Sequence, residues 1–182
     1  MRLKAPLFLA VLAMVLLGAA PPGRAREDWR VSLSAWGGLP ANITDNASHF
    51  SQYELFGAVR LPWSFDLPWR MRLDPALTLD VAALTDQRKV EYLPSAGFGF
   101  FVFKEGWPLA LEAGYRVAYL TDEKFEEKDF GGPVQFLGHI GFDVFLFGRA
   151  GIGYRFEHMS NASIYETNPS LNLHMVGLFV FF

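Results

Sequence analysis

The sequence predicts an all-β protein: an eight-stranded antiparallel transmembrane β-barrel of the bacterial outer membrane. Three observations support this fold class. Apolar and polar residues alternate with a period of two along runs of about ten or more residues, whereas strands of soluble sandwiches average about 5 to 6. Eight such runs follow an N-terminal targeting segment. The last run ends on a row of apolar residues that closes with phenylalanine.

The composition excludes several classes of protein. The 182-residue chain is 51% hydrophobic and 16% aromatic, and it has no cysteine. A disulfide-stabilised scaffold and a cysteine-based metal or redox site are therefore excluded. Charged residues make up 19% of the chain and the formal net charge is −3, which argues against a disordered chain and against a nucleic-acid partner.

Residues 1–25 are expected to be a signal peptide. The basic start, MRLK, precedes an apolar stretch at residues 5–17 that is too short to span a bilayer as a helix. The small residues of the GRA sequence that ends at Ala25 fit a signal-peptidase site. The remaining residues, 26–182, are expected to form a single barrel domain, and they contain no run of about 20 apolar residues.

The clearest alternation predicts strands around Leu109 to Tyr119 and Val134 to Asp143, each with an apolar and a more polar face. Polar linkers follow the first, third, fifth and seventh strands and alternate with mostly shorter connections, as in outer-membrane barrels. The exception is the Pro- and Trp-rich link 61–69, which is long for a periplasmic turn. The eight predicted strands are 28–37, 51–60, 70–82, 93–103, 107–120, 133–143, 147–160 and 171–182.

The last strand and the charged residues agree with this barrel. Val176, Leu178, Val180 and Phe182 share one parity, which resembles the C-terminal sorting signal of bacterial outer-membrane proteins. Eight strands enclose an interior that side chains fill, so no solute channel is expected. A lumen of paired charges is expected instead, because these residues fall mostly on inward faces: Arg30, Glu54, Arg60, Glu112, Arg116, Asp143, Arg149, Arg155 and Glu157.

One segment breaks the rule that outward residues are apolar. His158 and Ser160 continue the outward parity of the seventh strand, so an imidazole and a hydroxyl face the lipid side. Residues two apart on a strand lie about 7 Å apart on one face, which allows the histidine to act as a base toward the serine. Counting back from the C-terminus gives Asn172 and His174 the same outward parity, and Asn172 is expected to reach His158. Odd strands run outward, so these residues are expected near the outer leaflet.

The string HMSNA at residues 158–162, followed by Asn168-Pro169, resembles the hallmark of the PagL-type lipid A 3-O-deacylases. The likeness is close over residues 154–174, and elsewhere it is one of length, signal peptide, barrel pattern and terminal phenylalanine. The resemblance implies a serine nucleophile, a histidine base, a residue that orients the base and an asparagine in the oxyanion hole. These become Ser160, His158, Asn172 and Asn161.

The sequence departs from the family pattern at Asn172, where characterised members carry glutamate. An amide can orient the histidine but cannot stabilise the imidazolium by charge. Glu166 is an alternative partner for His158, and Asn172 is preferred because geometry precedes pKa in choosing a partner. Ser163 and Ser170 also stand where the family commonly has glycine.

The resemblance implies an outer-membrane serine esterase that hydrolyses the ester-linked acyl chain at the 3-O position of lipid A and releases a fatty acid. The alternative is a catalytically weak or inactive structural or adhesive barrel, in which HMSNA forms a polar rim. A soluble lipocalin-like carrier is disfavoured. Lipid A or lipopolysaccharide is the expected substrate, no cofactor or metal is expected, and a homodimer is left open. The acidic run 122–129 is interpreted as a solvated loop.

Overall fold

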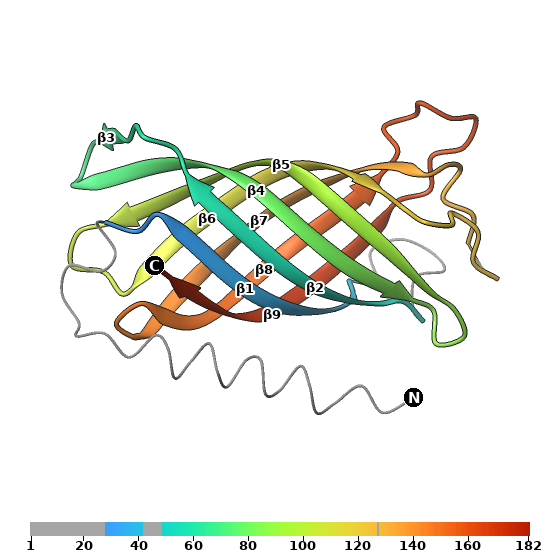
Figure 1. The fold of residues 1–182 in the computed structure, drawn as a ribbon, viewed down its shortest axis with the longest axis horizontal. Helices are drawn as coiled ribbons and strands as arrows, with labels where there is room; N and C mark the ends of the chain where they lie inside the picture. Colours follow the sequence, from blue (N-terminus) through green and yellow to red (C-terminus); the bar gives the residue numbers. More distant parts are fainter. Residues whose placement is uncertain (1–27, 42–48, 127) are drawn as a thin grey trace.

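The computed structural model describes residues 28–41, 49–126 and 128–182, so the predicted signal peptide lies outside the described part. No helix in these ranges is long and apolar enough to cross a membrane. Strands dominate the described residues (Figure 1). Their bounds are β1 (Val31–Pro40), β2 (Ser51–Arg60), β3 (Phe65–Leu67), β4 (Met71–Thr85), β5 (Val90–Lys104), β6 (Leu109–Tyr119), β7 (Val134–Phe147), β8 (Ala150–Ser160) and β9 (Leu171–Phe181).

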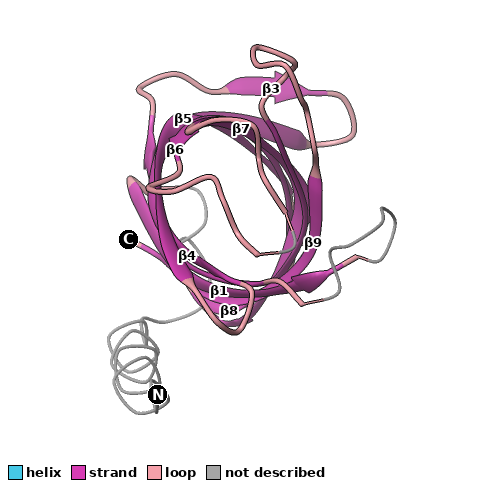
Figure 2. Cartoon of the chain, turned by 90° about the vertical axis from the view of Figure 1, so that its right-hand side faces the viewer, coloured by secondary structure: helices cyan, strands magenta, loops and turns pink. Residues whose placement is uncertain are grey.

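Eight of these strands close into an antiparallel barrel, which confirms the predicted fold class. Neighbours along the wall pair in chain order from β4 to β9, β9 pairs with β1, and β1 pairs with β2. The pairing of β2 directly with β4 completes the ring, and β3 lies outside it (Figure 2). Both chain ends of the described barrel lie at one end, called the terminal end here, and the longer connections lie at the loop end (Figure 1).

Two connections differ from the prediction. β7 continues to Phe147 with a register shift after Phe145, so β8 begins only at Ala150, after a tight turn in which Gly148 has φ 60°. The long link between β2 and β4 contains β3, which pairs with β4 from Phe65 opposite Leu73. This pairing satisfies backbone groups of β4 beyond the end of β2, and it accounts for the length of the link.

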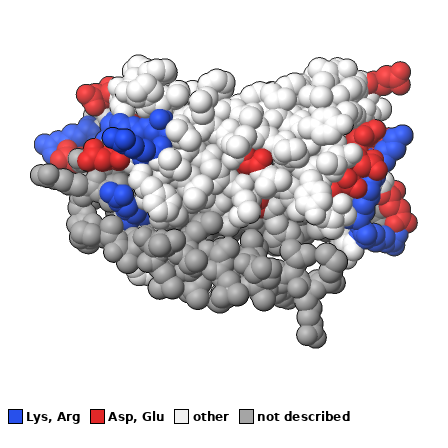
Figure 3. Space-filling model, in the orientation of Figure 1, with Lys and Arg blue, Asp and Glu red and all other residues white. Residues whose placement is uncertain are grey.

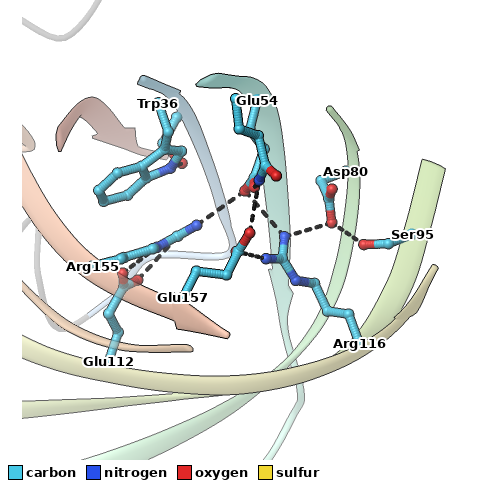
Figure 4. A network of polar contacts seen from close by, with 10 residues as sticks. Trp36, Glu54, Asp80, Ser95, Glu112, Arg116, Arg155 and Glu157 are labelled. Carbon is cyan, nitrogen blue, oxygen red and sulfur yellow. Dashed lines mark hydrogen bonds and ion pairs between the residues drawn. The ribbon is translucent and has the colours of Figure 1, made fainter. Parts of the chain in front are cut away.

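The lumen holds the expected paired charges around two buried arginines. Arg116 contacts Glu54 at 3.0 Å and Asp80 at 2.6 Å, and it also pairs with Glu157 (Figure 4). Arg30 lies at the terminal end and is exposed, so it does not share in this network. The members of the predicted inward set that are buried are Glu54, Glu112, Arg116, Asp143, Arg155 and Glu157.

Arg155 joins the same network from β8. Its Nη1 forms an ion pair with Glu54 Oε1 at 3.1 Å, and its Nε forms an ion pair with Glu112. The guanidinium carbon also lies 3.8 Å from the ring centroid of Trp36 and 4.1 Å from that of Phe56. Charged and aromatic groups from opposite walls therefore meet in the middle of the barrel.

Aromatic clusters fill the lumen at its two ends. At the terminal end Trp29 is fully buried, donates from Nε1 to Asp74 at 2.9 Å, and packs edge-on against Phe101 and Phe181. At the loop end, three phenylalanines pack together with centroids 5.1 to 5.8 Å apart: Phe50, Phe125 and Phe130. Side chains thus occupy the interior from end to end, as expected for eight strands.

The outer wall is apolar between charged ends. Outward residues of the central strands, such as Leu79, Phe98 and Ile140, are exposed large hydrophobics. Figure 3 shows the charged side chains gathered at both ends, with a broad and mostly uncharged band between them. This is the surface that a lipid bilayer covers in a transmembrane barrel.

Replacing Arg155 with methionine is expected to lower the free energy of unfolding by about 3–5 kcal/mol, because Glu54 and Glu112 then keep buried charges with fewer partners. Unfolding by urea in lipid vesicles, followed by tryptophan fluorescence, measures this loss. Arg88→Met is the control, because Arg88 pairs with Glu126 on an exposed loop. Equal midpoints for the two variants would contradict the assignment of Arg155 to the core network.

Candidate active site

The structure places the predicted polar residues of β8 on the outer wall. Glu157 and Met159 point inward and are buried, whereas His158 is exposed and Ser160 is half-buried on the opposite face. Both lie at the end of β8 nearest the loops (Figure 1). An imidazole and a hydroxyl therefore face the lipid side at the loop end of the barrel.

His158 is held by the neighbouring strand. It lies directly opposite Asn172 in the β8–β9 register, and its Nδ1 is 2.7 Å from Asn172 Oδ1. An amide oxygen only accepts hydrogen bonds, so with Oδ1 as the partner Nδ1 carries the hydrogen. The lone pair of the neutral ring is then on Nε2, which is the protonation state that a general base needs.

Ser160 shares the outer face with His158 but is not bonded to it in this structure. Across the β7–β8 ladder Ser160 is opposite Phe136, and His158 is opposite Gly138. Among the described residues the Ser160 hydroxyl makes no hydrogen bond. The transfer of its proton to His158 stays a prediction. Catalytic hydrogen bonds are often long before substrate binds.

Glu166 is exposed in the loop between β8 and β9, and within the described chain it forms no ion pair with His158. Of the two candidate partners, Asn172 and Glu166, only Asn172 contacts His158 in the structure.

Asn161 is fully buried and engaged by two loops. Its Nδ2 donates to Phe130 O at 3.0 Å and to Thr167 O at 2.7 Å, which uses both amide hydrogens. Its Oδ1 accepts from Ser163 N at 3.0 Å, and its own backbone N–H donates to Asn168 Oδ1 at 3.0 Å. The Asn161 side chain therefore organises the turn that follows Ser160, and its amide is not a free donor here.

Further contacts attach this turn to the loop between β6 and β7. Tyr165 packs over Gly132, and its hydroxyl accepts from Val134 N at 3.2 Å. Lys128 Nζ donates to Ser170 O at 2.5 Å, just before β9 begins. Partial burial lowers the pKa of Lys128. The start of β9, and with it Asn172, is thus fixed partly by a loop that is remote in sequence.

The other histidines lie elsewhere. His174 shares the outer face with Asn172, but its Nδ1 is 2.7 Å from the hydroxyl of Tyr154, whose ring stacks on it. His139 points into the lumen, is buried, and contacts Phe56 edge-on. Within the described ranges no three His, Cys, Asp or Glu side chains are grouped to hold a metal ion.

Asn161→Ala is expected to loosen the turn after Ser160, because the hydrogen bonds to Phe130 O and Thr167 O are lost together, at a total cost of about 1–3 kcal/mol. Hydrogen exchange of residues 162–168 should speed up about tenfold or more. Exchange measured by mass spectrometry tests this, with Glu166→Gln as the matched control in the same loop. Unchanged exchange in the Asn161 variant would refute the organising role.

Comparison with known proteins places this chain among relatives. A model of the family described as lipid A 3-O-deacylase (PagL) matches residues 51–180. The lipid A deacylase PagL of Bordetella bronchiseptica is 38% identical over 63 residues. That match spans 35% of this chain and only 35% of the relative's length.

Solved structures show the same fold. The crystal structure of the outer membrane enzyme PagL matches with a TM-score of 0.69 and 20% identity, over 82% of this chain and 98% of that one. The N-terminal β-barrel domain of Pseudomonas aeruginosa OprF matches with a TM-score of 0.52 and 15% identity, over 84% of this chain and 96% of that domain's chain. Because the family model spans most of the sequence, the chain belongs to the PagL family of lipid A 3-O-deacylases.

Proposed function

We propose that the protein is an outer-membrane serine esterase that hydrolyses the 3-O-linked acyl chain of lipid A. The observation that carries this proposal is the His158–Asn172 hydrogen bond on the lipid-facing wall, with Ser160 two residues away on the same face. Polar side chains at a lipid-facing position cost free energy, so their presence there indicates a function. Family membership supplies the class of substrate.

The proposed chemistry is acyl transfer to water through a covalent intermediate. His158 Nε2 takes the proton of the Ser160 hydroxyl as its oxygen attacks the ester carbonyl carbon. The tetrahedral intermediate collapses, the sugar oxygen leaves with the proton from His158, and the acyl chain stays on Ser160. Water, deprotonated by His158, then attacks the acyl-serine and releases the fatty acid.

The oxyanion is assigned to the backbone N–H of Ala162, in the turn after Ser160 that Asn161 holds. The Ala162 N–H has no hydrogen-bond partner among the described residues, and Ala162 and Ser163 have φ of 53° and 62°. Such a left-handed turn aims backbone donors in unusual directions, as oxyanion sites require. This assignment keeps Asn161 in the site as a positioning residue.

Substrate access is supported by the wall beside His158. Gly138 lies opposite His158, and a Cβ built there meets only the Tyr115 ring at 3.9 Å. The missing side chain leaves open space next to the imidazole on the lipid side. An acyl ester in the membrane can therefore approach the pair without leaving the lipid.

We further propose that the loop end faces the cell exterior, because outer-membrane barrels have short periplasmic turns and longer outer loops. Ser160 would then meet the outer leaflet, where lipid A resides. The neutral Asn172 keeps a second candidate open, a catalytically weak or inactive barrel of the same family.

Ser160→Ala and His158→Ala should each reduce deacylation by about 10⁴-fold or more, because each removes a member of the reacting unit. Mass spectrometry of lipid A from Gram-negative cells that express each variant measures the loss of one acyl chain. Heat-modifiable gel mobility checks folding, which should be unchanged since both side chains point away from the lumen. Unmodified lipid A in cells with folded wild-type protein would favour the inactive barrel.

Asn172→Glu should raise kcat by about tenfold, equivalent to about 1.4 kcal/mol, because a carboxylate stabilises the imidazolium that forms in the transition state. Steady-state deacylation of lipid A by the refolded wild-type and variant proteins measures kcat. A slower Asn172→Glu enzyme would exclude Asn172 as the partner of the base.

A further inference from the structure

The link between β2 and β4 lies at the terminal end, opposite the active site (Figure 1), and it carries large exposed side chains. The backbone hydrogen bond from Glu105 N to Arg70 O joins it to the β5–β6 turn, and the aromatic side chains of the two segments are all more than half exposed. This group is called the aromatic corner here. It consists of Trp63, Phe65, Trp69, Arg70, Lys104 and Trp107.

The backbone joins this corner to the lipid-facing wall. Phe65 pairs with Leu73 and Leu67 with Met71, and directly opposed residues of an antiparallel pair share a face. Odd-numbered residues of β4 face outward, as the exposed Leu77 shows. The apolar side of the β3–β4 hairpin therefore continues the membrane surface of the barrel toward the terminal end.

The tip of this hairpin holds Trp69 in an unfavourable backbone conformation. Trp69 and Arg70 have φ of 61° and 57°, a region that bulky side chains rarely adopt. Hairpin turns that need two successive residues with positive φ normally use Asn and Gly. Trp69 is nevertheless 77% exposed, so no packing inside the described protein compensates for this conformation. The Glu105 N–H bond to Arg70 O, at 3.1 Å, holds the turn beside the end of β5 without covering the Trp69 ring, so an external contact would stabilise this conformation further.

Two cations at the corner remain available to an external anion. Lys104 Nζ lies 4.2 Å from the ring centroid of Trp107 and pairs with no carboxylate among the described residues. Arg70 reaches Glu105 at 3.6 Å, but both side chains are largely exposed, which makes the pair weak. By contrast, Arg72 at the same end is bound to the buried Asp74.

We propose that the aromatic corner binds the headgroup of an anionic glycerophospholipid, with Arg70 and Lys104 on the phosphate and the tryptophans in the interfacial layer. Tryptophan and tyrosine favour the membrane–water interface, and cations there attract anionic lipids. The site lies at the opposite end from Ser160. It belongs to the inner leaflet if the proposed orientation of the esterase holds, but lipid binding itself does not depend on esterase activity.

The tryptophans of this chain make the test direct. All five are described, Trp29 and Trp36 are buried in the lumen, and the other three belong to the corner. Quenching of tryptophan fluorescence by bromine on lipid chains needs contact, so it reports on the corner. The protein is folded into phosphatidylcholine vesicles that contain an equal fraction of either brominated phosphatidylglycerol or brominated phosphatidylcholine.

Brominated phosphatidylglycerol should be enriched at the corner by about fivefold or more and should quench correspondingly better than brominated phosphatidylcholine. Arg70→Gln with Lys104→Gln should abolish this preference while keeping the quenching by brominated phosphatidylcholine. The matched control is Arg88→Gln with Lys124→Gln at the loop end, which should keep the preference. Deacylation should be unchanged in both double variants.

Equal quenching by the two lipids in the wild type, or an unchanged preference in the Arg70/Lys104 variant, would overturn the proposal. Quenching by aqueous acrylamide without quenching by either lipid would also overturn it. That outcome would place the corner in water, where a protein partner would be the occupant.

Discussion

Backbone hydrogen bonding is the constraint on which the rest of this structure depends. A strand inside a bilayer has no water to satisfy its N–H and C=O groups, so the sheet must close on itself. Here β9 pairs with β1, and β2 pairs past β3 to β4. Closure makes each residue of a strand face either the lumen or the lipid. A polar side chain therefore needs a hydrogen-bond or ion-pair partner in the lumen, or a functional role on the lipid-facing wall.

The two faces of β8 show this dependence. On the inner face, Arg155 and Glu157 join buried ion pairs that draw on strands from across the barrel. The residues that alternate with them on the same strand, including His158, face the lipid. The lumen network therefore fixes the position of the strand that carries the site, and Asn172 on β9 fixes the ring within it.

Much of this arrangement follows from the sequence. The period of two gives the eight strands and the outward parity of His158 and Ser160. Counting back from Phe182 along the last strand gives Asn172 the same parity, and the structure pairs it with His158. Local patterns carry this information because alternation and antiparallel pairing are regular.

Other features were not predictable because they depend on partners far along the chain. The link containing two prolines does not look like a strand, and β3 forms only because β4 extends past β2 and offers unpaired backbone groups. The resemblance predicted an oxyanion role for Asn161, but its amide hydrogens go to carbonyls of Phe130 and Thr167. Likewise, no spacing rule pairs Tyr154 with His174.

Ser160 is proposed to be a nucleophile that His158 activates. A fluorophosphonate tests this role directly, since an activated serine displaces fluoride and keeps the phosphonyl group. Peptide mass spectrometry of the treated, folded protein should find one adduct on Ser160, and none in the His158→Ala variant. No adduct in the wild type, or an adduct on Ser163 or Ser170 instead, would contradict the claim.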